Sequence, residues 1–288
     1  MPVVTVVGSA NLDLVVEVAR LPAVGETLLG RAVGRFPGGK GLNQAVAAAR
    51  SGATTRLCAV VGEDEAGDVL QRAARDAGVV GDLRRTPAAP TGVAHVFAIG
   101  GDNSIVVAAG ANGELRTEDA VREVAGAAVV LAQLEVPLDA VAAALAAGRA
   151  GGSVTLLNAA PAADDVLGML ADVDVLIVNE TECAELGGVE RLHVAGARTI
   201  VRTAGGDGVA LHRAGERPLH VPAFRIDPVD TTGAGDAFCG ALAAALAGGA
   251  AIEDALVRAS AAGAIVARHL GATTAELTPA AIDALIAR

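Results

Sequence analysis

Short runs of β-branched residues alternate along this chain with alanine-rich segments that have helical spacing. Six runs predict buried strands, at Val3–Val7, Thr54–Val61, Ala128–Leu134, Val154–Leu157, Val173–Val178 and Thr199–Thr203. Five segments predict helices, at Gln44–Arg50, Ala66–Ala77, Val121–Ala125, Leu138–Ala147 and Ala237–Leu246. This alternation predicts an α/β protein with a mostly parallel central sheet that helices cover on both faces.

Two stretches break the alternation, because strands in them follow one another without a helix. They are Leu12–Val18 with Thr27–Phe36, and Gly92–Ile99 with Ser104–Ala109. The residues between the paired strands are turn formers, Leu21-Pro22 and Gly100-Gly101-Asp102-Asn103. We expect a small second sheet that covers the crevice at the carboxyl ends of the main strands, and ordinary edge hairpins are the alternative. The predicted domains are a main domain of residues 1–10, 38–89 and 111–288 and a lid of residues 11–37 and 90–110.

Length and composition favour one large, ordered domain. A chain of 288 residues is near the upper limit for a single hydrophobic core. Hydrophobic residues make up 52% of the chain and charged residues 19%, which argues against disorder. The net charge of −11 argues against a protein that wraps nucleic acid, because phosphate neutralisation needs a basic face.

Cysteine and histidine spacing gives no support for a zinc site or a disulfide framework. The three cysteines form no CxxC pair and the five histidines form no HExxH pattern. Met1 leads into the first predicted strand without a basic leader, and the alanine-rich runs near Val141 and Ala241 are interrupted before they reach membrane-spanning length. Free thiols fit a reducing compartment, so we expect a cytoplasmic protein with no membrane partner.

The glycine-rich turn before Asp236 is the segment that most strongly indicates chemistry. Asp230-Thr231-Thr232-Gly233-Ala234-Gly235-Asp236 runs directly into a predicted helix. Unpaired N–H groups and the positive end of the helix dipole meet there, which predicts an anion site. The Asp236 carboxylate beside it is suited to accept a proton during phosphoryl transfer. The alternative is a simple helix cap, which would not require two glycines in the turn.

A second glycine turn, Gly38-Gly39-Lys40-Gly41, contains the only lysine of the chain. Gly34 through Lys40 nearly matches a Walker A loop, but Gly41 takes the position of the magnesium-binding Ser or Thr. We therefore expect a turn that lets the backbone approach a ligand, with Lys40 and Asn43 as donors. The composition otherwise prefers arginine, which suggests that Lys40 occupies a place that a planar guanidinium does not fit; chance survival is the alternative.

Polar residues also follow several predicted strands. Asn11 and Asp13 alternate onto one face and offer donor and acceptor groups for vicinal hydroxyls. Asn179 with Glu182 after another strand could organise magnesium and phosphate, although a helix cap explains Asn179 equally well. Glu135, just past a strand, is a candidate of the same kind.

Together these motifs resemble those of the ribokinase family, the PfkB-type carbohydrate kinases. The resemblance covers nearly the whole chain, in the order that the family has. The matching motifs are Asn11-x-Asp13, Gly38-Gly39-Lys40-Gly41-x-Asn43, Val61-Gly62-x-Asp64-x-x-Gly67, Ala109-Gly110-Ala111-Asn112, Asn179-x-x-Glu182, Thr203-x-Gly205-x-x-Gly208 and Asp230-Thr231-x-Gly233-Ala234-Gly235-Asp236.

The resemblance implies a three-layer α/β/α domain with a small β-sheet lid, through which two copies pair as a homodimer. The implied base and anion hole are Asp236, Gly233, Ala234 and Gly235. The implied sugar-binding residues are Asn11, Asp13, Gly39, Lys40, Asn43, Glu135 and Asp236. The implied ATP-binding residues are Asn179, Thr203, Gly205, Gly208, Gly235 and Ser260. The implied cation sites are Asn179 and Glu182 for Mg²⁺, and Asp230, Thr232, Val266, His269 and Gly271 for K⁺.

The resemblance also implies the reaction, ATP-dependent phosphorylation of a small sugar, with D-ribose converted to ribose 5-phosphate. A nucleoside kinase of the same family and a sugar or nucleotide sensor without catalysis are the alternatives. Four features depart from the family pattern: the Asn158-Ala159-Ala160-Pro161 segment, a shorter connection between Glu182 and Thr203, Ser260 near the expected adenine site, and Ala275 near the expected K⁺ site.

Overall fold

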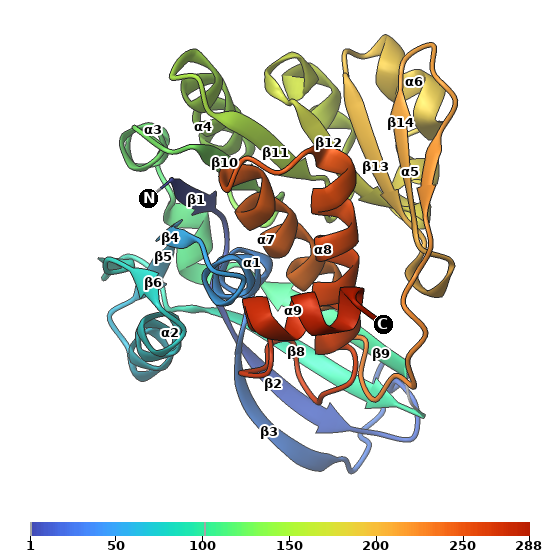
Figure 1. The fold of residues 1–288 in the computed structure, drawn as a ribbon. Coiled ribbons are helices and arrows are strands. Elements are labelled where there is room, and N and C mark those ends of the chain that lie inside the picture. The colour runs from blue at the N-terminus through green and yellow to red at the C-terminus, as the bar shows by residue number, and fades with distance from the viewer. Residues whose placement is uncertain (1, 101) are drawn as a thin grey trace.

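A nine-stranded sheet forms the centre of the molecule (Figure 1). The computed structural model describes residues 2–100 and 102–288, so Gly101 of the predicted turn 100–103 lies outside the described residues. The strand order is β15-β14-β13-β12-β11-β10-β1-β4-β6, and only β14 and β15 run antiparallel to their neighbours. The strands are β1 (Val3–Val7), β4 (Thr54–Cys58), β6 (Val79–Val80), β10 (Val129–Ala132), β11 (Val154–Asn158), β12 (Val175–Asn179), β13 (Thr199–Thr203), β14 (Val209–Arg213) and β15 (Leu219–Val221).

Helices cover both faces of this sheet, which confirms the predicted α/β architecture. One layer contains α1 (Lys40–Arg50), α2 (Glu65–Asp76), α7 (Ala234–Ala247) and α8 (Ile252–Val266), with α9 (Pro279–Ile286) packed against α8. The other contains α3 (Thr117–Glu123), α4 (Leu138–Ala150), η2 (Asp164–Asp172), α5 (Glu180–Glu185) and α6 (Gly188–Val194). Two further 3₁₀ turns are η1 (Gly110–Glu114) and η3 (Gly205–Asp207).

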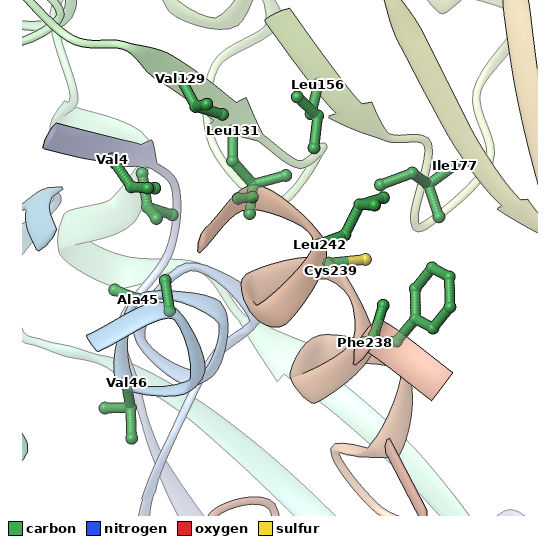
Figure 2. Packing of buried hydrophobic residues seen from close by; sticks show 14 of the residues in the cluster. Val4, Ala45, Val46, Val129, Leu131, Leu156, Ile177, Phe238, Cys239 and Leu242 are labelled. Atoms are coloured by element: carbon green, nitrogen blue, oxygen red, sulfur yellow. The ribbon is translucent and has the colours of Figure 1, made fainter. Parts of the chain in front are cut away.

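Alternate residues of the central strands supply the two cores. Leu131, Leu156 and Ile177 point to the side of α1 and α7, where Leu242 and Cys239 pack against them (Figure 2). The residues between them on the same strands face the α3 and α4 side, and Val130 is one example. Since both faces of each strand are buried, the strands are nearly continuous apolar runs, as expected for a parallel sheet.

A separate four-stranded sheet, which we call the lid, lies beside the main domain (Figure 1). Its order is β3-β2-β8-β9, with β2 and β8 parallel and the other pairs antiparallel. Its strands are β2 (Asn11–Glu17), β3 (Arg31–Gly38), β8 (Gly92–Ile99) and β9 (Asp102–Ala108). The structure therefore confirms the predicted small β-sheet.

Several predicted elements have other bounds in the structure: the predicted strand Thr27–Phe36 begins only at Arg31, and the predicted helix Val121–Ala125 is Thr117–Glu123. Two further differences have a clear cause. The predicted strand Thr54–Val61 is broken after Cys58, where the chain leaves the main sheet and β5 (Val60–Gly62) pairs with β7 (Arg84–Thr86). Helix α1 begins at Lys40 and not at the predicted Gln44, because Gly39 adopts a left-handed φ of 88° and starts the helix there. Across the described residues, 2–100 and 102–288, no helix combines the length and apolarity needed to cross a membrane.

Close packing of α1 against α7 predicts a large effect of one methyl group. A Cβ added at Gly240 would lie 2.3 Å from the carbonyl oxygen of Gln44 and 2.7 Å from Cβ of Ala47. Since backbone cannot move aside as a flexible side chain can, we expect Gly240→Ala to lower the free energy of unfolding by about 1–3 kcal/mol. The matched control is Gly168→Ala, where the added methyl group meets open space. Equal melting temperatures of the two variants would contradict this packing.

Candidate active site

Several of the polar residues singled out in the sequence lie near the point where the strand order of the main sheet reverses, between β1 and β10. Helix α1, which follows β1 through the lid, packs on one face, and α4, which follows β10, packs on the other. The crevice outside the carboxyl ends of β1 and β10 is therefore a topological switch point, the usual ligand site of an open α/β sheet. Ser9 follows β1 there, and Gln133 and Glu135 follow β10.

Asp236 lies in the first turn of α7, directly after the glycine turn. The helix cap is Gly233, whose φ of 75° is left-handed and whose missing Cβ would lie 2.3 Å from the carbonyl oxygen of Ala272. First-turn amides such as that of Gly235 have no acceptor within the helix, so they point at the space in front of it. The amide of Ala234 instead donates to the carbonyl oxygen of Thr231 at 3.2 Å, so it is engaged within the turn.

The Asp236 side chain does not cap the helix, because both carboxylate oxygens accept hydrogen bonds from α1. Asn43 Nδ2 donates to Oδ2 at 3.0 Å, and Gln44 Nε2 donates to Oδ1 at 2.9 Å. Asp236 is only 8% exposed. Two uncharged donors therefore hold a buried carboxylate at the crevice.

Gln44 continues this contact into the sheet. Its Nε2 also donates to Asn158 Oδ1 at 3.0 Å, and its Oε1 accepts from Gln133 Nε2 at 2.6 Å. Asn158 ends β11 and Gln133 follows β10, so Gln44 links Asp236 to two strand ends. Neither Gln44 nor Asn158 is predicted as a site residue from the sequence. A single amide inside a predicted helix or at the end of a predicted strand matches no motif that marks a binding site.

Glu135, which follows β10, contacts the start of α1 at Lys40. Glu135 Oε2 accepts the Ser9 hydroxyl and the backbone N–H of Lys40, the latter at 3.1 Å. Attraction to Asp236 raises the pKa of Lys40 despite its burial, and Glu135 and Glu182 add to the effect. Lys40 therefore remains an ammonium group among carboxylates. Ser9 is not among the candidate site residues predicted from the sequence.

Asp13 projects from lid strand β2 toward the same crevice. Burial, together with repulsion from Glu135 and Asp236, raises the pKa of Asp13 to about 7. In the described part of the chain its Oδ1 has no hydrogen-bond partner. A buried acceptor without a partner favours a ligand that brings hydroxyl donors, which is the role that the sequence predicts for Asp13.

Asn11 is fixed by a residue that sequence analysis named only as part of a motif. Asn112 Nδ2 donates to Asn11 Oδ1 at 2.7 Å, while Asn112 Oδ1 accepts the backbone N–H of Ala10 at 2.9 Å. This pairing occupies the oxygen of the Asn11 carboxamide and leaves its NH₂ group as the donor for a ligand.

A pocket on the other side of Asp236 brings together several residues predicted to bind nucleotide. Asn179, Glu182 and Thr203 line it, together with Lys40, Gly235 and Asp236. Asn179 and Glu182 also form a reciprocal capping box at the start of α5, with bonds of 2.7 and 2.8 Å. The predicted helix cap at Asn179 is thus confirmed, and the same residue also lines the pocket. Burial raises the pKa of Glu182, and the Asn179 N–H and Lys40 oppose part of the rise.

Three other predicted nucleotide residues are not among those that line this pocket. Gly205 and Gly208 shape the turn around η3, where a Cβ on Gly208 would lie 2.3 Å from the carbonyl oxygen of Val221. Ser260 lies on α8, and its buried hydroxyl has no partner among the residues that the structure describes. The connection from Glu182 to Thr203, expected to be short, contains the end of α5 and helix α6.

The residues predicted to hold a monovalent cation lie in two loops that Asp230 joins. Its Oδ1 accepts the N–H of Thr232 and its Oδ2 accepts the N–H of Gly271, both at 2.9 Å. Burial works against the charged form, but these hydrogen bonds outweigh it and lower the pKa of Asp230. Val266 ends α8, and its carbonyl oxygen accepts the His269 N–H at 2.9 Å. Asp230 therefore braces the two loops beside the glycine turn.

Comparisons with known proteins agree with this geometry. The profile of the pfkB family carbohydrate kinases matches residues 1–279. Ribokinase of Bacillus subtilis (strain 168) is 37% identical over 261 residues, which cover 88% of each protein. Deoxyribokinase of Salmonella typhi is 35% identical over 258 residues, which cover 83% of this chain and 84% of that protein.

The fold comparison gives the same result. The structure of Arabidopsis thaliana ribokinase, solved with ribose and ATP, superposes with a TM-score of 0.86 at 31% identity, over 99% of this chain and 98% of that one. The match spans the main sheet, the lid and the crevice between them. The chain belongs to the pfkB family of carbohydrate kinases.

Proposed function

We propose that this carbohydrate kinase transfers the γ-phosphoryl group of ATP to the terminal hydroxyl of D-ribose, giving ribose 5-phosphate. The observation that carries the proposal is the position of Asp236, buried between the polar crevice under the lid and the pocket at Asn179 and Thr203. A sugar in the crevice and a nucleotide in the pocket would meet at this carboxylate.

In this mechanism Asp236 accepts the proton of the attacking hydroxyl. Asn11, Asp13, Gly39, Asn43 and Glu135 orient the sugar. The free amides of the glycine turn and the Lys40 ammonium stabilise the charge that develops on the transferred phosphoryl group. Water is kept from the reacting atoms by the lid, since Asp13 on β2 reaches over the crevice.

Glu182 and Asn179 are suited to support Mg²⁺ on the nucleotide side. Both line the pocket and present oxygen atoms, the ligand type that Mg²⁺ prefers. When bound, Mg²⁺ would neutralise charge on the nucleotide phosphates. Thr203, Gly205, Gly208 and Ser260 complete the proposed ATP site.

An unphosphorylated pentose fits the charge of the crevice. Asp13, Glu135 and Asp236 together carry more charge than Lys40 balances, which disfavours a sugar that already bears phosphate. The solved relative from Arabidopsis contains ribose, and the Salmonella relative is a deoxyribokinase. The 2-hydroxyl is therefore the group that distinguishes the two candidate sugars. Asp13 Oδ1, which has no partner among the described residues, and the NH₂ group of Asn11 favour a sugar that has this hydroxyl, because a hydroxyl both donates and accepts hydrogen bonds.

The first prediction concerns the base. Asp236→Asn keeps the shape of the side chain but removes the proton acceptor, so kcat should fall by about 10²–10⁴-fold. Sugar affinity, measured by calorimetry, should change much less. Asp82→Asn is the matched control, because Asp82 is exposed and pairs with Arg75 far from the crevice. Activity of Asp236→Asn within a few-fold of the parent would eliminate Asp236 as the base.

The second prediction concerns the substrate. In an ADP-release assay over pentoses, hexoses, nucleosides and sugar phosphates, kcat/KM should be highest for D-ribose. It should exceed the value for 2-deoxyribose by about tenfold or more, because the deoxy sugar leaves a buried polar group unpaired. A tenfold preference for 2-deoxyribose would make this chain a deoxyribokinase, and a preference for a nucleoside would overturn the sugar assignment. Binding of ribose without any ADP release would indicate a sensor.

The third prediction concerns K⁺, which we place beside the loops braced by Asp230, Thr232, Val266, His269 and Gly271. A bound cation would fix the carbonyls of these loops and so orient Gly233 and Gly235. The rate should therefore rise when K⁺ replaces choline at constant ionic strength. Asp230→Asn should lose most of this activation. A rate that does not depend on K⁺ would remove the cation from the proposal.

A homodimer through the lid is also part of the proposal. Phe36, Asp13, Ala94 and Val107 are cross-strand partners, so their side chains share one face of the lid. Phe36 is 43% exposed and Val107 is 44% exposed on this face. The lid of a second copy would cover these apolar groups beside the sugar.

A further inference from the structure

We propose that Gln44 is a positioning residue for Asp236 and that its uncharged carboxamide fixes the carboxylate in the orientation needed to accept a proton. This inference rests on the proposed role of Asp236 as the base. Gln44 itself lies behind the carboxylate, with no exposed surface, so it acts through Asp236 and touches neither substrate.

The hydrogen bonds of Gln44 leave no freedom to its side chain. Both N–H groups of Nε2 are used, one by Asp236 Oδ1 at 2.9 Å and one by Asn158 Oδ1 at 3.0 Å. The oxygen accepts from Gln133 Nε2 at 2.6 Å. Because Gln133 supplies a donor and Asn158 an acceptor, a flipped carboxamide would face like groups on both sides. The network thus selects one orientation, in which a donor faces Asp236.

An uncharged donor is required at this position. Asp236 is buried and accepts one hydrogen bond on each oxygen, from Gln44 and from Asn43. A carboxamide has no proton to gain or lose near neutral pH, so it orients the carboxylate without competing for the substrate proton. The other charged or titratable groups near this pair are Asp13 on the lid, Glu135 after β10, Lys40 on α1, Glu182 on α5 and Cys239 on α7.

Gln44→Glu is the informative substitution, because it turns the donor into a titratable group of the same shape. A protonated Glu at position 44 can still donate to Asp236, so the pair works while it shares one proton. When the pair loses that proton, two carboxylates face each other at hydrogen-bond distance and repel. The variant should therefore gain an alkaline limb that the parent does not have.

The experiment measures kcat at saturating sugar and ATP from pH 6 to pH 9. Relative to the parent, kcat of Gln44→Glu should fall by about tenfold or more over this range, while KM for the sugar changes little. Gln71→Glu is the matched control, since Gln71 is a buried glutamine on α2 whose Oε1 accepts the N–H of Leu83. Its pH profile should follow that of the parent.

Gln44→Met covers the case in which a second carboxyl group prevents folding. It has a similar length, carries no charge and removes all three hydrogen bonds, so kcat should fall by about tenfold or more at every pH. A parental pH profile in Gln44→Glu, or a kcat of Gln44→Met within twofold of the parent, would overturn the inference.

Asp236→Asn, measured in the same series, separates the two claims. If it is inactive while the Gln44 variants behave like the parent, the base assignment stands and the positioning role fails. If Asp236→Asn retains parental activity, the proposed base fails, and the inference about Gln44 fails with it.

Discussion

Contact between helices α1 and α7 determines the geometry on which the rest of the site depends. Gly240 lets the two helices approach closely, since any side chain there would meet the backbone of α1. One helix carries Asp236 and the other carries Asn43 and Gln44, whose carboxamides hold it. The packing of α1 against α7 therefore also determines the position of the candidate base. A shift of α1 would move Lys40 and would also displace the two carboxamides that hold the candidate base on α7.

Burial gives the crevice its chemical character and also lowers the stability of the unliganded protein. Asp13, Glu135 and Asp236 lie close enough for repulsion and desolvation to raise the pKa of Asp13 to about 7. Because the pKa is higher in the folded state than in an unfolded chain, the unliganded protein loses stability as the pH rises toward that value. A sugar that donates hydroxyl groups to these carboxylates would offset the penalty. The site is thus poorly satisfied until its ligand is present, as is common where function and stability compete.

Much of this architecture was predictable because its signals are local. Alternation of apolar strands with alanine-rich helices gives the parallel sheet, and strands without helices between them give the lid. The glycine turn before Asp236 is visible because two glycines and an acidic residue at the start of a predicted helix are typical of an anion site. Lys40, as the only lysine, could likewise be found by composition alone.

What could not be predicted depends on contacts between distant segments. Gln44 and Asn158 are 114 positions apart, and Gln133 reaches the same point from another strand. No single-sequence pattern marks an amide whose partners lie on other elements. The start of α1 was placed late for a related reason, since Gly39 and Gly41 mask the helical pattern that the fold imposes. Helices α6, α8 and α9 are not predicted from the sequence either, although α8 packs against the glycine turn itself, where a Cβ on Gly263 would lie 3.0 Å from the carbonyl oxygen of Ala234.

The central claim, that a terminal sugar hydroxyl is delivered to Asp236, is tested most directly by where the phosphate lands. The product formed from ATP and D-ribose can be observed by proton-coupled phosphorus NMR. Phosphate on the terminal carbon couples to the methylene protons and gives a triplet, which is the result that this account predicts. A doublet, from phosphate on a ring hydroxyl, would contradict it, because the sugar would then have to bind in another orientation beneath the lid.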